Sequence, residues 1–316
     1  MIEMRSFLGS RRKPGWISIL PQNGRVALVH AVCLPGARPA IQWLENVATE
    51  RGLTEALQRL RKVRKLDAHA CTTLMAAADC TLTQLEAPPV PREERKDALR
   101  WALKDVVNYP VDSACIEVLD LPSEGLPAGR QAGVLVVSAA EQAVRACVAP
   151  FETAKVRLDV VDAPELAQRN VAILLADENR GLVFLRIDET GMMLTLTFHG
   201  ELIAVRRSEL NAAQLASEDA GQRERMIERL VLDLQRSLDN FDRQYGHIPV
   251  SKVVVASFPA VPGLVEELGR GIYVPVVAMN LNDVMDFAAV PELKEPDVQA
   301  RYLLAIGAAL RTGEAA

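Results

Sequence analysis

The sequence has no apolar run long enough to cross a membrane. Charged residues interrupt its longest apolar stretches well short of the roughly 20 residues that a membrane helix needs. Residues 1–16 include basic side chains but no apolar core after them, so a secretory signal is not expected. These absences favour a soluble chain.

Disulfide-forming cysteine pairs and an excess of positive charge are also lacking. The 5 cysteines are scattered and odd in number, which suits a reducing cytoplasm better than a disulfide framework. The formal net charge of -5 argues against a nucleic-acid binder on bulk electrostatics. We therefore expect neither a secreted disulfide scaffold nor a nucleic-acid partner.

Motifs for common catalytic chemistry are missing as well. The chain contains neither the G-x-x-x-x-G-K-[ST] phosphate loop nor the G-x-S-x-G nucleophile turn. His69 and Cys71 lie one residue apart, with Asp79 and Cys80 beyond, but a zinc site would need a second close pair. Buried core cysteines on a strand are the commoner arrangement, so we expect no metal site and no catalytic residue.

The sequence does contain enough apolar residues for a large folded core. With 316 residues, 49% of them hydrophobic and 24% charged, the chain is long enough for two domains and is not disordered. Its clearest pattern runs from Met226 to Tyr245, where apolar residues recur three or four apart and predict one stripe on a long helix. Gly246 ends this helix, the β-branched run 252–256 predicts a buried strand, and a further helix follows at 264–268.

The order of the expected elements indicates an internal duplication. A meander of three strands is followed by a helix and a strand in each half, which is the plan of actin-like, ribonuclease H-like lobes. Two unrelated three-stranded sheets are the alternative. The first copy is expected at 16–20, 25–32, 40–44, 53–65 and 70–75, and the second at 182–187, 192–198, 201–206, 223–245 and 253–256.

An additional segment separates the two copies. A proline-rich break at 87–91 precedes it, and Pro91 suits the start of a helix. Elements are expected at 92–107 (helix), 114–121 and 132–138 (strands), 141–148 (helix) and 155–161 (strand). We predict an α/β chain with a first lobe over 1–180, an inserted α+β subdomain at about 86–162, and a second lobe over 181–316 whose last helix spans 298–311.

The residue choices in these elements resemble the PilM family of type IV pilus assembly proteins. The resemblance is strongest from Gln235 to Leu264, in "Q-R-S-L-D-x-F-x-x-Q-Y-G", "I-P-V-x-x-V-V-V" and "P-G-L". "A-L-R-W-A-L-K-D-V-V-N-Y-P" resembles the family's inserted helix, and "Y-L-L-A-I-G-A-A-L-R" its closing helix. The resemblance implies an actin-like ATPase fold, a cytoplasmic location at the inner membrane and a relation to the cytoplasmic domain of GspL. Within the family, the chain is most similar to members that serve mannose-sensitive haemagglutinin (MSHA) type pili.

The resemblance also implies where phosphates and a metal ion would bind. Members that bind ATP usually have "D-I-G" at the first hairpin, where this chain has Ser18, Ile19 and Leu20. The Asp and Gly of the second hairpin fall on Arg186 and Asp188. Because Mg²⁺ is bound through carboxylates and phosphates, both changes remove stabilisation that phosphoryl transfer needs.

The adenosine end of that site departs from the family as well. Its triplet of glycines falls on Ala256, Ser257 and Phe258, whose side chains would fill the adenine slot. One carboxylate could be regained, because Asp188 lies two residues from the expected position and so on the same strand face. We expect no bound cofactor, and neither ATP hydrolysis nor ATP binding with Mg²⁺.

Two classes of function follow from the resemblance. The first is a non-catalytic platform that grips the cytoplasmic N-terminal tail of a single-span inner-membrane partner, like PilN or MshJ, and couples pilus motor components to the envelope complex. The tail would lie in a groove between the first lobe and the inserted subdomain. The second is an active actin-like ATPase whose nucleotide state controls assembly, and the departures at Ser18, Arg186 and Phe258 argue against it.

The N-terminal residues carry a cluster of positive charge. Arg5, Arg11, Arg12 and Lys13 are interleaved with apolar residues. The segment is either a disordered tail that is basic by chance or a short arm that meets the anionic inner leaflet. In the second case we expect only weak contact with the membrane surface, screened by salt.

Overall fold

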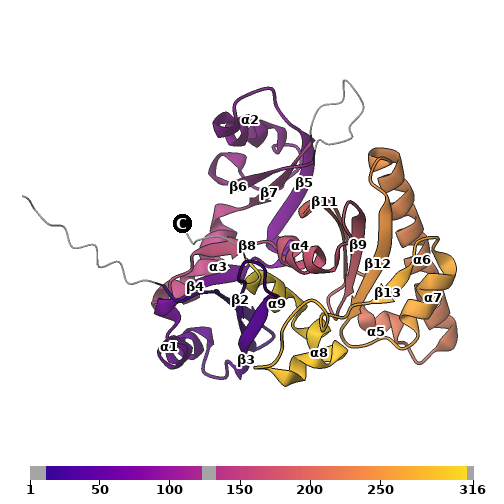
Figure 1. The fold of residues 1–316 in the computed structure, drawn as a ribbon. Coiled ribbons are helices and arrows are strands. Elements are labelled where there is room, and N and C mark those ends of the chain that lie inside the picture. Colours follow the sequence, from indigo (N-terminus) through magenta and orange to yellow (C-terminus); the bar gives the residue numbers. More distant parts are fainter. Residues whose placement is uncertain (1–11, 123–132, 312–316) are drawn as a thin grey trace, which may run out of the picture.

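Two five-stranded sheets and a smaller three-stranded sheet make up the chain (Figure 1). The structure is a computed structural model and describes residues 12–122 and 133–311. None of the helices in these two ranges combines the length and the apolar character that spanning a bilayer requires.

The first sheet has the strand order β3-β2-β1-β4-β8. Its first three strands form an antiparallel meander, and β4 and β8 continue it in parallel. The strands are β1 (Trp16–Gln22), β2 (Arg25–Val32), β3 (Ala40–Ala48), β4 (Ala70–Leu74) and β8 (Val160–Asp162). Helix α1 (Leu53–Arg64) buries Ala56, Leu57 and Leu60 against this sheet, in a core that also contains Phe151 of α3 (Glu141–Thr153).

The second sheet repeats this order as β11-β10-β9-β12-β13. It again has an antiparallel meander followed by two parallel strands, so the structure confirms the predicted duplication. The strands are β9 (Gly181–Ile187), β10 (Met192–Phe198), β11 (Glu201–Ser208), β12 (Val250–Ser257) and β13 (Val276–Ala278). Short helix α5 (Ala212–Leu215) and helix α7 (Leu264–Gly271) complete this lobe.

The long helix α6 (Ala220–Tyr245) covers one face of the second sheet. Its buried residues follow the predicted stripe, which confirms that the stripe belongs to the core: Ile227, Leu230, Leu234, Leu238, Phe241 and Tyr245. The helix begins three residues before the expected Arg223, because Asp219 caps it by accepting a hydrogen bond from the Gln222 amide at 2.8 Å.

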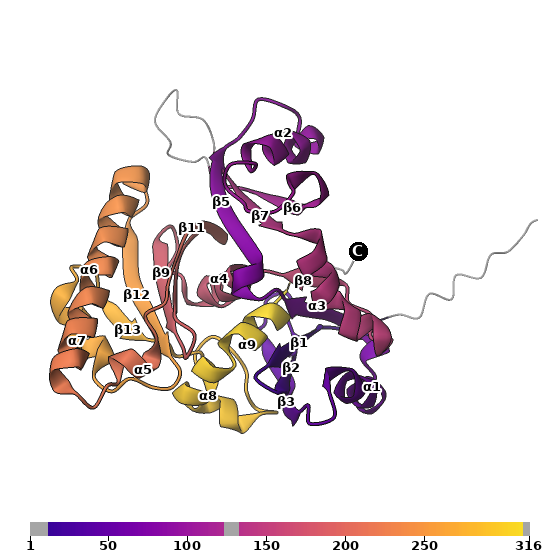
Figure 2. The ribbon, with the colours of Figure 1, turned by 180° about the vertical axis from the view of Figure 1, so that it is seen from behind.

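Two helices that lie between the sheets hold the lobes together (Figures 1 and 2). Helix α4 (Pro164–Leu175) follows the first sheet but packs on β9, β10 and β11, whereas α9 (Leu303–Ala309) follows the second sheet but packs on β1 and β2. The two helices also contact each other, and the Asn170 side-chain amide of α4 donates to the Gly307 carbonyl of α9 at 2.9 Å. The single helix expected over 298–311 is instead two short helices, α8 (Pro296–Arg301) and α9, because the chain leaves helical geometry at Tyr302.

The three-stranded sheet has the order β5-β7-β6. It consists of β5 (Cys80–Glu86), β6 (Cys115–Asp120) and β7 (Gly133–Ala139), with α2 (Arg95–Ala102) packed on it. These bounds differ from the expected range of about 86–162, because α3 and β8 pack in the first lobe. The expected helix over 92–107 is a 3-10 turn over 92–94 followed by the shorter α2. Most of the loop between β6 and β7 lies outside the described residues.

Candidate functional site

A cavity of about 200 Å³ lies between the two lobes. The tips of the β1–β2 and β9–β10 hairpins, the end of β12, and the α8–α9 junction form its walls. Of the residues predicted from the sequence, Leu20, Arg186, Asp188 and Phe258 line this cavity, whereas Ser18, Ala256 and Ser257 do not. The duplicated fold therefore brings residues from both halves of the chain to one place.

Ser18, at the position of the family's first carboxylate, points into the interior. Its side chain is fully buried, and its hydroxyl donates to the Ala305 carbonyl of α9 at 2.6 Å. Leu20, two residues on, is 7% exposed and belongs to the core that α9 completes. This part of β1 therefore ties the first sheet to α9 and presents no carboxylate to the cavity.

Asp188, the carboxylate that could have replaced a metal ligand, is used by the protein itself. One carboxylate oxygen accepts hydrogen bonds from the Thr190 amide at 2.8 Å, the Thr190 hydroxyl at 2.6 Å and the Gly191 amide at 3.2 Å, which closes the β9–β10 turn. The other oxygen forms an ion pair with Arg186. A metal ion would have to displace a guanidinium group that is already in place.

Phe258 stands at the carboxyl end of β12. Its backbone amide donates to the Ile187 carbonyl at 3.0 Å, and the Arg301 guanidinium lies 5.6 Å from its ring centroid. Arg301 also lies 5.4 Å from the ring centroid of Tyr302, so cation–π contacts join these three side chains on one wall of the cavity. Ala256, below this wall, is buried, and the Ser257 hydroxyl bonds to the Pro259 carbonyl at 2.7 Å.

Several residues of this cavity were not predicted from the sequence. The Arg25 guanidinium donates to the Asn46 side-chain oxygen at 2.8 Å, and the Asn46 side-chain amide donates to the Tyr302 hydroxyl at 2.9 Å. Tyr302 and Arg301 are far from Arg25 in the chain, and no local pattern shows that α9 returns to the first sheet. The clustering of Arg25, Arg186 and Arg301 was therefore not visible in the sequence.

The cavity contains charged side chains of both signs, with arginines outnumbering the carboxylates of Asp188 and Glu189. Three guanidinium groups line it, and the described residues include no group of three or more His, Cys, Asp and Glu that could hold a metal ion. Mg²⁺ is bound by carboxylates together with substrate phosphates, and cationic side chains repel it.

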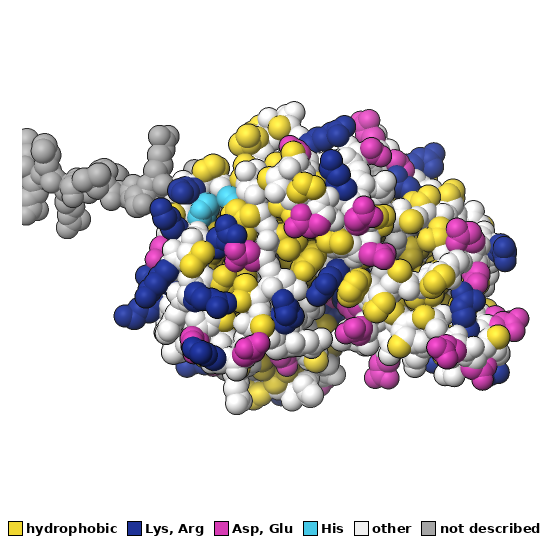
Figure 3. All heavy atoms as spheres, turned by 90° about the horizontal axis from the view of Figure 1, so that it is seen from below, with side chains coloured by type: hydrophobic (Ala, Val, Ile, Leu, Met, Phe, Trp, Pro, Cys, Tyr) yellow, Lys and Arg dark blue, Asp and Glu magenta, His cyan; other side chains and the backbone are white. Residues whose placement is uncertain are grey.

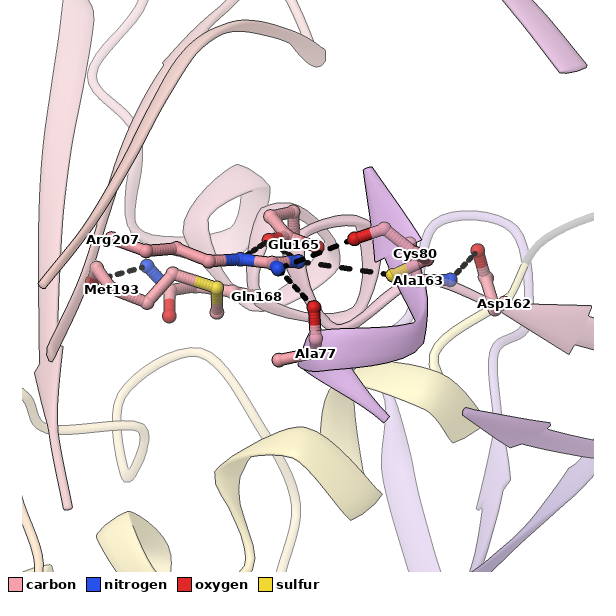
Figure 4. A network of polar contacts seen from close by, with 8 residues as sticks. All are labelled: Ala77, Cys80, Asp162, Ala163, Glu165, Gln168, Met193 and Arg207. Atoms are coloured by element: carbon pink, nitrogen blue, oxygen red, sulfur yellow. Dashed lines mark hydrogen bonds and ion pairs between the residues drawn. The ribbon is translucent and has the colours of Figure 1, made fainter. Parts of the chain in front are cut away.

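A second polar cluster lies where the three-stranded sheet joins both lobes (Figure 4). Arg207 of β11 forms an ion pair with Glu165 of α4, whose side chain is fully buried. Arg207 also donates to the carbonyls of Ala77, in the turn before β5, and of Cys80, the first residue of β5. Burial raises the pKa of the Cys80 thiol, so this cysteine stays protonated near neutral pH. One arginine thus connects the second sheet, α4 and the beginning of the insertion.

Apolar contacts complete the junction between the insertion and the first lobe. Met75, Cys80, Ala139 and Ala163 form a small core there, and Val144 of α3 packs against it. Both β5 and β6 are edge strands of the three-stranded sheet. An edge strand next to a helix is a common binding place for an extended peptide.

Comparison with known proteins identifies the fold. No family model matches the chain, and no curated protein matches it. A chain of a solved structure described as the PilM-PilN type IV pilus biogenesis complex superposes with a TM-score of 0.73 at 19% sequence identity, over 95% of this chain and 98% of that one. The chain has an actin-like ATPase fold.

A second solved structure has a more distant likeness. It is the cytoplasmic domain of EpsL, described as an inner membrane component of the type II secretion system of Vibrio cholerae. Its TM-score is 0.50 at 15% identity, over 94% of this chain and 98% of that one. At such identities, both likenesses show the fold alone. They agree with the predicted α/β class of two lobes, each with a mixed sheet and helices.

Proposed function

We propose that this chain is a non-catalytic platform protein of a type IV pilus assembly machine. The observation that carries the proposal is the likeness to a chain of the PilM-PilN complex over almost the full length of both chains. The likeness to the cytoplasmic domain of EpsL, a secretion-system component, supports a role of the same general kind. In this proposal the chain resembles MshI, the MSHA-type member of the PilM family, and works in the cytoplasm at the inner membrane.

Its partner would be an inner-membrane protein like PilN or MshJ, held through a short cytoplasmic tail. The tail would lie between the first lobe and the insertion, next to α3 and the edge strand β5, where backbone hydrogen bonds to an edge strand supply affinity. Arg207 and Glu165 hold the insertion against α4 and β11, so the groove would be pre-formed, which reduces the entropic cost of binding. The bound platform would then couple motor components to the envelope complex.

The residues in and next to the cavity between the lobes support the non-catalytic part of the proposal. Ser18 bonds to α9, Asp188 is occupied by Arg186 and by its own turn, and Phe258 stands at the adenosine end.

The alternative is an active ATPase. Binding of ATP-Mg²⁺ with a Kd below the millimolar range would stabilise the fold by more than about 1 kcal/mol at saturation. We expect no rise in melting temperature with ATP-Mg²⁺ and no phosphate release. A clear rise that Asp188→Ala abolishes would support the ATPase instead.

The partner is tested by recovery from an envelope extract with the tagged chain, read by mass spectrometry. We expect a single-span inner-membrane protein with a short cytoplasmic tail to be enriched without added nucleotide. Val144→Asp, at the junction of α3 with the insertion, should lower the recovery. Leu232→Asp, on an α6 residue that is 50% exposed, should leave it unchanged, provided that both variants melt cooperatively. Equal loss in both variants, or enrichment of no such membrane protein, would contradict the proposal.

A further inference from the structure

Helix α1 presents a basic surface on the side of the first lobe that faces away from its core. Arg59 and Lys62 of this helix and Lys65, the residue that caps its C-terminal end, are exposed, while Ala56, Leu57 and Leu60 of the helix are buried. Val63 stands beside them and is 65% exposed. We call these four outward residues the α1 basic face. In Figure 3, Lys and Arg side chains gather over the left end of the molecule, which is the end that carries α1 in Figure 1.

Basic residues outnumber acidic residues in the segment that carries this face. Residues 51–65 contain 6 basic side chains and 1 acidic side chain, in a chain whose net charge is -5. Arg61 pairs with Asp67 at 2.9 Å, and Arg64 pairs with Glu45. Among the residues that the structure describes, Arg59, Lys62 and Lys65 form no such ion pair. Cations at this spacing repel one another, so a surface of opposite charge would relieve them.

The described chain begins next to this face. The backbone amide of Lys13 donates to the Ala68 carbonyl at 2.8 Å, three residues beyond Lys65, and the Lys13 side chain is exposed. Arg12, expected to be part of a free basic arm, is instead paired with Asp159 at 2.8 Å. Arg5 and Arg11 lie outside the described residues.

We propose that the α1 basic face docks onto the anionic lipid headgroups of a bilayer. Three unpaired cations attract such a surface, and an exposed valine between them can bury its side chain at the headgroup boundary. A folded helix that is anchored by its buried face would bring these groups to the bilayer without a spanning segment. The inference deepens the proposed function, since it adds a direct lipid contact to the contact made through the membrane partner.

Co-sedimentation of the whole chain with vesicles tests this docking. The vesicles are phosphatidylcholine with or without phosphatidylglycerol, at low and at high salt. The test variant carries Arg59→Ala, Lys62→Ala and Lys65→Asn together. Asn is chosen because Lys65 has a left-handed backbone (φ 51°), which Asn tolerates better than Ala. The control variant carries Arg225→Ala, Arg229→Ala and Arg236→Ala, which removes the same charge from exposed positions of α6.

The expected result is binding to phosphatidylglycerol vesicles that falls as salt rises, and none to phosphatidylcholine. With about 1 kcal/mol for each cation at the surface, the test variant should lose about 100-fold in partition coefficient, and the control should lose much less. Equal losses in the two variants, or binding that ignores salt, would overturn the proposal. A DNA duplex can be added as a competitor. If it releases the chain from the vesicles at a DNA phosphate concentration below that of the lipid phosphate, the face would be assigned to nucleic acid. Because no partner tail is present, these outcomes are separate from those of the partner test.

Discussion

At the scale of single residues, polar side chains in and next to the cavity between the lobes stabilise the fold. Ser18 bonds to α9, Asp188 closes the β9–β10 turn, and Asn46 joins β3 to Tyr302. Each is close to the place where the family resemblance puts a nucleotide, yet each has a partner within the protein. Changes to these residues should therefore be visible as changes in stability.

Replacing Asp188 by Ala tests this directly. The substitution removes three hydrogen bonds to the turn and leaves the Arg186 guanidinium, which is 15% exposed, without its carboxylate. We expect the free energy of unfolding to fall by about 1–3 kcal/mol in urea denaturation. Glu189→Ala, at the exposed neighbouring position, is the control and should change it by less than about 0.5 kcal/mol. A stability unchanged by Asp188→Ala would indicate that this carboxylate serves a ligand.

His69 gives the fold a dependence on pH. It is buried edge-on to His30, with ring centroids 4.6 Å apart. Burial first, and then the charges of His30 and Lys13, lower its pKa from 6.5 to about 4. Between these two values the unfolded chain binds a proton that the folded chain does not, so stability is full above pH 6.5 and is lost as the pH falls towards 4.

Urea denaturation over this pH range should show the loss in the wild-type chain. His69→Gln should flatten the dependence, because Gln does not titrate. A wild-type slope in His69→Gln would show that other groups cause the loss.

At the scale of elements, a helix can be predicted from the sequence when only one of its faces is buried. Helix α6 was predicted because its apolar residues follow one stripe. Helix α4 was not predicted, because Glu165, Ala167, Gln168, Asn170, Val171 and Ala172 are all buried and leave no amphipathic pattern. Its Gln168 side-chain amide nitrogen donates to the Phe184 carbonyl at 2.9 Å, a partner that only the folded chain supplies. Pro164 at the first helical position was the one available signal.

The crossing of α4 and α9 depends on Gly307. A Cβ atom at this position would lie 2.0 Å from the Ala167 backbone carbonyl oxygen, so the helices would have to separate. Gly307→Ala should lower the free energy of unfolding by about 1–3 kcal/mol or more, as overpacking does. Gly269→Ala in α7 is the matched control, because nothing lies within 4 Å of its added Cβ, and it should stabilise the helix by up to about 1 kcal/mol. Similar effects of both substitutions in thermal melting would contradict tight packing at this crossing.

At the scale of the whole molecule, the duplication was predictable from the sequence. The packing of the C-terminal helix α9 on the first sheet was not. Repeated meanders indicated two lobes, and the family resemblance pointed to Leu20, Arg186 and Asp188, which line one cavity. The bounds of the insertion and the contribution of α8 and α9 depend on contacts between distant segments, which no local pattern encodes. For that reason Arg301 and Tyr302 were absent from the predicted site.

The central claim is that the chain binds a membrane partner's tail without using nucleotide. The most direct measurement is a calorimetric titration of the chain with a synthetic peptide of the cytoplasmic tail recovered from the envelope, with and without ATP-Mg²⁺. We predict one saturable site with the same Kd in both conditions and no release of phosphate. Binding that requires ATP-Mg²⁺, or no binding at millimolar peptide, would contradict the account.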